Sequence, residues 1–401
     1  MRLAVVSPFV DRRHGTERAL AELLERLAGK EKCEIHLYAQ RVEDLALVQP
    51  GVARTEESGA IFWHRIPSIP GPHLLQFLSW FFLNSLSRKW DRHVHGLRCD
   101  LVLSPGINCL DADVVIVHAL FHRLRELARE EDREAIRPGL LRGLHRRAYY
   151  ALLTWLECRI YENQRVSLGA VSRRTATLLA NYFRRQDVRI IPNAVDAAQF
   201  SPPVRLSRRH LARLRRNFQE NDLVLLLIGN DWRVKGLETV LCAMSALREL
   251  PIRLIVVGDD SPDSFLEMAN SLGISERCHF EPSRKDVLDF YAAADIYVSP
   301  SREDSFGLPL AEAMACGLPV ITSVFAGVAD LIQNGVDGFV LRDPHAPQQL
   351  AQLLAELYHD GEKRKRAGGA SAGVALEWDW DRNAAAVWQL LQDALGRKRG
   401  A

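Results

Sequence analysis

The sequence predicts an α/β protein made of two sheet domains, and three observations support this prediction. The chain has 401 residues, more than one hydrophobic core usually holds, so two domains are expected. Short apolar runs of strand type alternate with longer stretches of helical periodicity, which is the pattern of parallel sheets covered by helices. Hydrophobic residues make up 47% and charged residues 25% of the chain, a balance typical of globular proteins.

Charge and cysteine content exclude several classes of function. The formal net charge is +2, too small for a nucleic-acid-binding chain, so no nucleic-acid partner is expected. The seven cysteines are scattered without a C-x-x-C pair, which indicates buried thiols in a reducing compartment. The first ten residues read as a strand rather than a signal peptide, and no run of about 18 uncharged apolar residues occurs. We expect a cytoplasmic protein, with association at the inner face of the cytoplasmic membrane left open.

The chain begins with a strand, a turn and a helix. The strand is Arg2–Pro8, the helix is Glu17–Ala28, and the turn between them contains Gly15. This order can cradle a phosphate, although a single glycine more often marks a tight turn. Further strands of this half are predicted at residues 34–38, 60–66, 101–104 and 114–117.

One histidine of this half is a candidate catalytic residue. His118 follows the apolar strand 114–117 at its carboxyl end, where parallel sheets place their ligands. An imidazole there can donate to a charge that develops near neutral pH. The alternatives are that His118 is structural, or that the neighbouring His122 takes the role.

Two helical segments combine aromatic and basic residues. Leu74–Leu83 is rich in aromatic and aliphatic side chains, and residues 137–165 interleave arginine with tyrosine and tryptophan. Such helices can lie on an anionic lipid surface. The alternative is a core helix with a solvated arginine face, and it is favoured for the first segment. The candidates for membrane or acceptor contact are Arg142, Arg146, Arg147 and Trp155.

A charged stretch at residues 201–217 separates the two halves, and the domain boundary is predicted there. The first domain is assigned residues 1–205, and the second is assigned residues 206–376. The second domain opens with the strand Asp222–Gly229.

A turn with two cations follows this strand. It contains Arg233 and Lys235 and leads into a helix at residues 237–247. Fixed cations at the carboxyl end of a strand can neutralise a diphosphate, including the charge that grows as it departs. A charged surface turn is the alternative.

The most informative stretch, residues 297–322, is predicted as strand, polar loop, short helix and strand. Asp304 in the loop and Glu312 in the helix are separated by seven residues. Carboxylates accept hydrogen bonds from hydroxyls, whereas Gly307 and the helix start offer N–H groups to an anion. A nucleotide sugar has both features, because hydroxyls flank its diphosphate. The alternative is that Glu312 only favours the helix dipole and Asp304 is a solvated loop acid.

The string PSREDSFGLPLAEAMACGLPVIT resembles the signature of the family 4 retaining glycosyltransferases. Those enzymes have the GT-B architecture, in which two Rossmann-like domains face each other across a cleft and the last helix crosses back to the first domain. The resemblance implies that residues 377–396 are this last helix. It also implies that Glu312 holds the nucleotide ribose and that Asp304, where the family has Glu, contacts the donor sugar.

The resemblance extends to further positions of the donor site. It implies that His118 lies beside the donor sugar and that Arg233 and Lys235 assist departure of the diphosphate. Asn230 stands where many members have Arg, so Arg233 is expected to take over that role. The remaining donor-binding positions implied by the resemblance are Gly15, Gly258, Ser305, Phe306, Gly307 and Leu308.

The implied reaction is transfer of a sugar, with retention at the anomeric carbon, from a nucleoside diphosphate to a hydroxyl acceptor. UDP is expected rather than GDP, and the acceptor is a glycan or glycolipid of bacterial cell-envelope polysaccharide or lipopolysaccharide synthesis. No cofactor is expected. No bound metal is expected either, because no D-x-D pair occurs in a suitable loop. The alternatives are a nucleotide-sugar epimerase or phosphorylase-like enzyme of the same architecture, and a non-catalytic nucleotide-sugar-binding scaffold.

Overall fold

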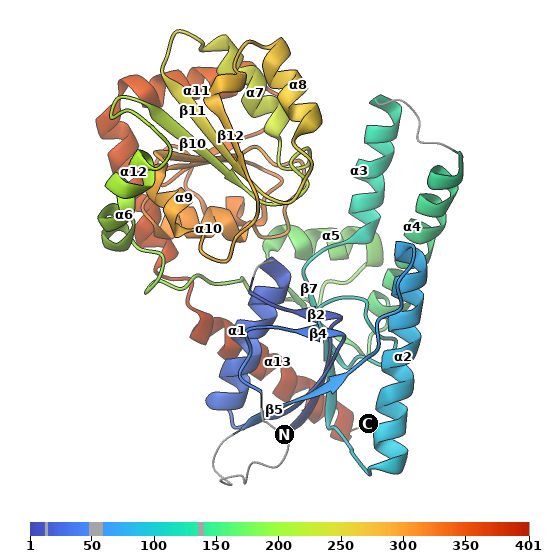
Figure 1. The fold of residues 1–401 in the computed structure, drawn as a ribbon. Helices are drawn as coiled ribbons and strands as arrows, with labels where there is room; N and C mark the ends of the chain where they lie inside the picture. The colour runs from blue at the N-terminus through green and yellow to red at the C-terminus, as the bar shows by residue number, and fades with distance from the viewer. Residues whose placement is uncertain (13–14, 48–58, 135–139, 401) are drawn as a thin grey trace. The chain divides into compact units, whose positions relative to one another are not determined.

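A computed structural model describes residues 1–12, 15–47, 59–134 and 140–400. The chain forms two compact units, each built around a parallel sheet (Figure 1). Unit 1 comprises Met1–Pro192 and Asp381–Ala401, and unit 2 comprises Asn193–Trp380. The structure thus places the first division near residue 192, earlier than the predicted 205, and the second near residue 380 rather than 376.

Among the described residues, the sheet of unit 1 has seven strands in the order β5-β3-β1-β6-β7-β8-β9. All neighbouring strands are parallel. The strands predicted at 34–38, 60–66, 101–104 and 114–117 are confirmed. The seven strands are β1 (Arg2–Val6), β3 (Glu34–Ala39), β5 (Ala60–Arg65), β6 (Leu101–Ser104), β7 (Val114–Val117), β8 (Ser167–Ala170) and β9 (Arg189–Ile190), with a small pair β2 (Phe9–Val10) and β4 (Arg41–Val42) beside them.

Helices enclose this sheet because each buries an apolar face against it. One core cluster joins residues of β1, β7 and β8 to Trp80, Leu153 and Leu179, which lie on three different helices. The helices of unit 1 are α1 (Gly15–Gly29), α2 (His73–Val94), α3 (Phe121–Glu134), α4 (Leu140–Tyr161), α5 (Arg173–Phe183) and α13 (Trp380–Gly400). The last of them pairs with the sheet through Asp393, which accepts a hydrogen bond from Arg189 at 2.7 Å.

The sheet of unit 2 has six strands in the order β12-β11-β10-β13-β14-β15. Its central strands are buried and almost entirely apolar, as expected for a parallel sheet covered on both faces. The strands are β10 (Leu223–Ile228), β11 (Ile252–Val257), β12 (Cys278–Glu281), β13 (Ile296–Ser299), β14 (Val320–Ser323) and β15 (Phe339–Leu341). The helices are α6 (Pro202–Leu214), α7 (Leu237–Ala246), α8 (Asp263–Ser271), α9 (Leu288–Ala293), α10 (Leu308–Ala315), α11 (Pro347–His359) and α12 (Gly361–Ala375), with short 3-10 turns η1 (Ser275–Arg277) and η2 (Gly327–Leu331).

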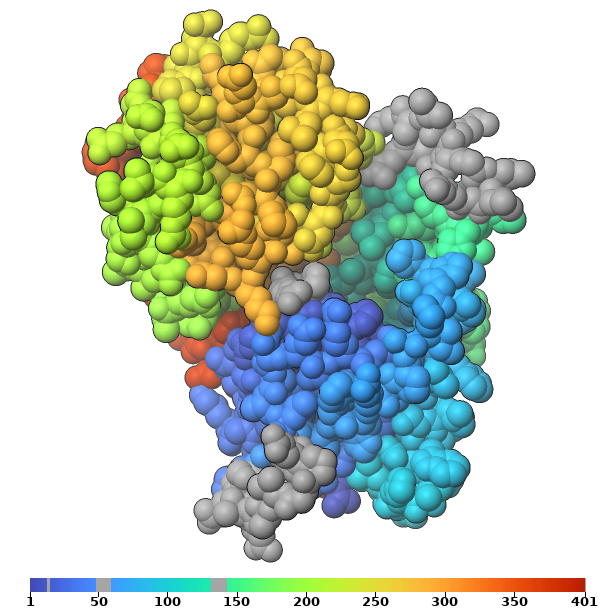
Figure 2. All heavy atoms as spheres, viewed as in Figure 1, coloured from blue at the N-terminus to red at the C-terminus, as the bar shows by residue number. Residues whose placement is uncertain are grey.

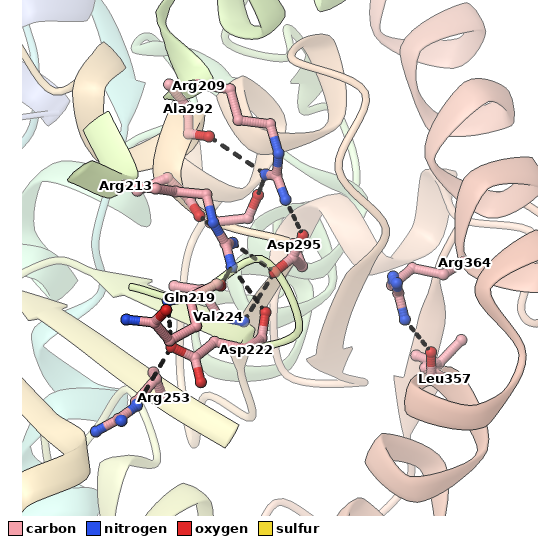
Figure 3. Close-up of polar contacts among 12 residues, drawn as sticks. Arg209, Arg213, Gln219, Asp222, Val224, Arg253, Ala292, Asp295, Leu357 and Arg364 are labelled. Atoms are coloured by element: carbon pink, nitrogen blue, oxygen red, sulfur yellow. Dashed lines mark hydrogen bonds and ion pairs between the residues drawn. The ribbon is translucent and has the colours of Figure 1, made fainter. Parts of the chain in front are cut away.

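Arginines on α6 explain why the boundary lies earlier than predicted. Figure 3 shows Arg209 and Arg213 converging on Asp295, which precedes β13. Arg213 donates to Asp295 Oδ2 at 3.0 Å, and the same oxygen accepts the backbone N–H of Val224 at 2.9 Å. Arg205 also donates to the carbonyl oxygen of Cys316 at 2.8 Å. The sequence shows these residues only as a charged linker, whereas their contacts attach α6 to unit 2.

We expect Arg213→Met to destabilise unit 2 by about 3 kcal/mol, because it leaves the carboxylate of Asp295 buried with one cation fewer. The side chains of Arg213 and Asp295 are 9% and 11% exposed. Arg208→Met is the matched control, since the Arg208 and Asp286 side chains are 42% and 64% exposed and such a pair contributes little. Urea-induced unfolding measures both variants. Equal losses of stability would contradict the special role of Arg213.

The cysteines are free thiols, as the spacing predicts. Cys33, Cys109 and Cys316 are buried, and the other four are half-buried. Burial raises the pKa of both Cys33 and Cys278 to about 12. These thiols are therefore protonated and unreactive near neutral pH.

Candidate active site

The turn after β10 is held in one conformation by its neighbours. The carboxylate of Asp260, in the loop after β11, accepts the backbone N–H groups of Asp231 at 2.9 Å and Trp232 at 2.7 Å. Gly236 ends the turn with φ +81°, and a Cβ there would lie 2.2 Å from the carbonyl oxygen of Pro300. This position therefore requires glycine. The rigidity distinguishes the turn from an ordinary solvated surface turn.

Two of the predicted residues meet at the ends of adjacent strands. Lys235 follows β10, Asp304 follows β13, and the Lys235 ammonium donates a hydrogen bond to Asp304 Oδ2. Their side chains are 16% and 17% exposed. An ammonium and a carboxylate held together in this way can contact a phosphate and a sugar hydroxyl at the same time.

Arg233 has a different partner. It forms an ion pair with Glu238 on α7, with 3.2 Å between Arg233 Nη2 and Glu238 Oε1. The Arg233 side chain is 40% exposed, so its guanidinium is more solvated than the Lys235 ammonium. Its predicted role beside the diphosphate stays a prediction.

The loop that carries Asp304 is fastened to the loop after β14. The backbone N–H of Asp304 donates to the carbonyl oxygen of Phe325 at 3.0 Å, and the N–H of Gly327 donates to the Asp304 carbonyl at 2.7 Å. Gly307 then adopts φ +91° and α10 begins at Leu308. Within the described residues no side chain caps this helix start. Pro309 has no N–H and the N–H of Leu310 donates to the Gly307 carbonyl oxygen at 3.0 Å, so the backbone N–H of Leu308 is the group best placed to bind an anion.

Among the predicted donor-binding residues of this loop, two have buried side chains. Phe306 is buried and packs edge-on against Trp378, with the ring centroids 6.3 Å apart, and Leu308 is also buried. Only the backbone of these residues can contact a ligand. Ser305 and Gly307 lie between Asp304 and the helix start, as the sequence indicates.

Glu312 is almost fully buried on α10, and a tyrosine positions it. The hydroxyl of Tyr291, on α9, lies 2.8 Å from Glu312 Oε2 and 3.0 Å from the carbonyl oxygen of Pro309. Burial and the negative charge of Glu312 raise the pKa of Tyr291, so the phenol stays protonated and acts as the donor. Sequence reasoning missed Tyr291, because an aromatic residue in an apolar helix carries no signal of its partner.

Gly258 has a packing reason for being glycine. A Cβ at this position would lie 2.3 Å from the carbonyl oxygen of Gly229 and 2.6 Å from Trp232 Nε1. The loops after β10 and β11 could then no longer approach each other closely. Its predicted role in donor binding stays a prediction.

In unit 1, a buried glutamate distinguishes the two candidate histidines. Glu157 on α4 is fully buried and accepts the backbone N–H groups of Phe121 at 2.6 Å and His122 at 2.9 Å. Its carboxylate also lies 2.6 Å from His122 Nδ1. His122 is thus part of the structure that caps α3.

His118 follows β7 with its side chain half-buried. Burial lowers the pKa of His118 to about 4, so its imidazole is neutral near pH 7 and can donate one hydrogen bond. Gly15 is exposed at the start of α1, and the two residues before it lie outside the described part of the chain.

The predicted membrane residues lie on α4. Arg147 and Trp155 are exposed, and Arg146 is half-buried. The side chain of Arg142 lies outside the described residues. Among the helices that the structure describes, none has the length and apolarity needed to span a bilayer.

Two family models match most of the chain. The model described as Glycosyltransferase Family 4 matches residues 13–199, and the model described as Glycosyl transferases group 1 matches residues 210–372.

Curated relatives are similar over part of their length. The D-inositol 3-phosphate glycosyltransferase of Xylanimonas cellulosilytica is 31% identical over 220 residues, covering 53% of this chain and 52% of the relative. The lipopolysaccharide glucosyltransferase WaaG of Escherichia coli is 34% identical over 150 residues, covering 36% of this chain and 40% of the relative. The chain spans about half the length of the first of these relatives.

Solved structures are similar over nearly the whole chain. WaaG, a glycosyltransferase involved in lipopolysaccharide biosynthesis, aligns with a TM-score of 0.75 at 20% identity, covering 96% of this chain and 98% of that one. Anabaena Alr3699/HepE in complex with UDP-glucose aligns with a TM-score of 0.72 at 17% identity, covering 98% and 100%. At this identity the likeness establishes the fold, which is the GT-B architecture of two Rossmann-like domains.

Proposed function

Since the chain belongs to glycosyltransferase family 4, we propose that it transfers a sugar from a nucleoside-diphosphate sugar to a hydroxyl acceptor. The observation that carries this proposal is the pairing of Lys235 with Asp304 at the ends of β10 and β13. The uncapped start of α10 follows Asp304 in the same loop. Together they offer donors for a diphosphate and an acceptor for sugar hydroxyls.

The roles of the residues follow from their chemistry. Lys235 and the backbone N–H of Leu308 at the start of α10 bind the diphosphate, Asp304 accepts a hydroxyl of the donor sugar, and Glu312 accepts the ribose hydroxyls. When the bond between the anomeric carbon and the phosphate oxygen breaks, its electron pair goes to the diphosphate. The Lys235 ammonium stabilises that charge. The acceptor oxygen then bonds to the anomeric carbon, and its proton passes to the leaving diphosphate.

This scheme gives retention at the anomeric carbon when the acceptor attacks from the side that the diphosphate leaves. Cations of the protein take the place of a metal ion in it. We therefore propose a retaining, metal-independent reaction, and transfer that continues unchanged in the presence of a chelator would support the second part.

UDP is the proposed donor nucleotide, and a glycan or glycolipid of the cell envelope is the proposed acceptor. UDP and UDP-glucose are bound in the solved HepE structures, and the relative WaaG is named as a lipopolysaccharide glucosyltransferase. Both observations support the proposal. An epimerase would consume the donor without an acceptor, and a scaffold would bind it without turnover.

A thermal-shift comparison of UDP, GDP and ADP tests the donor site. We expect UDP to raise the unfolding temperature most. A ligand at 100 times its Kd stabilises the folded state by about 2.7 kcal/mol, so the nucleotide with the highest affinity gives the largest shift at a given concentration. Lys235→Ala is the control, and the shift with UDP should be smaller in this variant. A larger shift with GDP would make the base assignment wrong. The absence of any nucleotide-dependent shift would contradict the proposed function.

A further inference from the structure

The outer face of α2 carries a continuous apolar stripe. Large side chains recur every three or four residues on this helix, which places them on one face. In Figure 2 the residues of α2, light blue to cyan, lie at the surface of unit 1. The members of the stripe are Leu75 (50% exposed), Leu78 (44%), Phe82 (67%), Leu86 (51%), Trp90 (60%) and Val94 (54%).

The inner face of α2 is fixed to unit 1 by other residues. Of the residues of α2, all of which the structure describes, only Trp80 and Asn84 are fully buried. Phe77 packs edge-on against Tyr149 of α4, with ring centroids 6.4 Å apart. The interpretation of this segment as a core helix therefore holds for its inner face alone. The stripe is turned outward by these packing contacts.

Acidic side chains on both helices are directed inward. Asp91 is the only acid within α2, and it accepts a hydrogen bond from the Tyr38 hydroxyl at 2.9 Å and pairs with His64 Nδ1 at 2.8 Å. Glu157 is the only acid within α4. It is fully buried, and its carboxylate accepts a backbone N–H at the start of α3. The outward faces of the two helices thus present apolar and basic groups among their described side chains.

Exposed cations accompany the stripe. Lys89 and Arg92 lie near the carboxyl end of α2, and Arg147 lies on α4. The α4 helix adds two exposed apolar side chains, Leu144 at 64% and Trp155 at 52%. Aromatic and aliphatic side chains flanked by lysine and arginine are the pattern of a helix that lies in the interface of an anionic bilayer.

We propose that α2 is the principal membrane-binding element of this protein and lies along the surface of an anionic lipid bilayer, with α4 beside it. A second copy of the chain fits the surface less well. In a paired arrangement Lys89 and Arg92 would find no acid on the facing α2, because Asp91 is already engaged inside the unit. The membrane binding itself is inferred from the surface of α2. Its purpose, which is access to a lipid-borne acceptor, rests on the proposed function.

Vesicle flotation of the full chain tests the proposal. The vesicles are phosphatidylcholine alone, or phosphatidylcholine with about one-third phosphatidylglycerol. We expect flotation with the anionic vesicles and a partition constant about 100-fold lower for the double variant Phe82→Glu and Leu86→Glu, which loses two inserted side chains. Leu211→Glu is the matched control, since Leu211 is an exposed leucine (55%) on α6 of unit 2, and it should float like the unchanged chain.

Several outcomes would overturn the proposal. The double variant could float as well as the unchanged chain, or the unchanged chain could fail to bind either vesicle. Sedimentation could instead reveal a dimer that the double variant dissociates, which would assign the stripe to a second copy. The UDP-dependent thermal shift of the unchanged chain separates the two hypotheses, because lipid binding without nucleotide binding would contradict the proposed function and leave this inference standing. The same shift in the double variant checks that its fold is kept.

Discussion

Lys235→Ala is expected to lower kcat by about 10²–10³-fold, while the affinity for the donor falls by less. The Lys235 ammonium is largely shielded from solvent and held by Asp304. A charge in such a place interacts strongly with an anion, and the charge on the diphosphate grows as the bond to the sugar breaks. Steady-state kinetics with the UDP-sugar that gives the largest rate would measure kcat and KM separately.

Arg233→Ala is the matched control for this effect, because it removes a cation from the same turn. Arg233 is more exposed and is paired with Glu238, so we expect a clearly smaller loss of kcat. A Lys235→Ala variant with a higher KM and an unchanged kcat would show that the lysine binds ground state and transition state equally. The assignment of Lys235 to leaving-group stabilisation would then be wrong.

The sequence predicts Lys235 and Asp304 at the carboxyl ends of two strands by local rules, whereas the structure shows that these strands are neighbours and that the two side chains meet. Each residue lies in the loop after an apolar strand, and the carboxyl ends of neighbouring parallel strands meet at one edge of a sheet. The same reasoning does not place Arg233, whose side chain turns toward α7. A strand end fixes the position of a turn, whereas the direction of a long side chain depends on its partner.

Contacts between distant segments could not be predicted. His118 and His122 are four residues apart, and the residue that distinguishes them, Glu157, comes 35 residues after His122. The charged stretch before β10 likewise reads as a linker until Asp295, 82 residues after Arg213, is placed beside it. In both cases the decisive partner comes from a segment far along the chain.

The outward face of α2 illustrates a different difficulty. This helix has apolar side chains around most of its circumference, so periodicity does not identify the buried side. The structure identifies it through Trp80, Asn84 and the inward Asp91. Hydrophobicity alone therefore favours a core helix, and only packing separates a core face from an exposed one.

The second large effect is expected at Glu312. Glu312→Gln should lower kcat/KM by about 10–100-fold, because a hydrogen bond from a hydroxyl to a charged acceptor contributes about 1.5–3 kcal/mol. The carboxylate is nearly buried and held by Tyr291, so a glutamine of the same shape should leave the fold intact. Circular dichroism and the unfolding temperature check the fold, and an unchanged kcat/KM in a folded variant would remove Glu312 from the donor site.

Tyr291→Phe tests whether the tyrosine acts through Glu312. Deleting the hydroxyl removes one hydrogen bond to the carboxylate, so we expect kcat/KM to fall by up to about tenfold. If Tyr291 only positions Glu312, Tyr291→Phe should have little further effect on kcat/KM in the Glu312→Gln background, because both changes remove the same interaction. Losses that multiply in the double variant would instead show that the two residues act independently, and the hydrogen bond between them would have no part in donor binding.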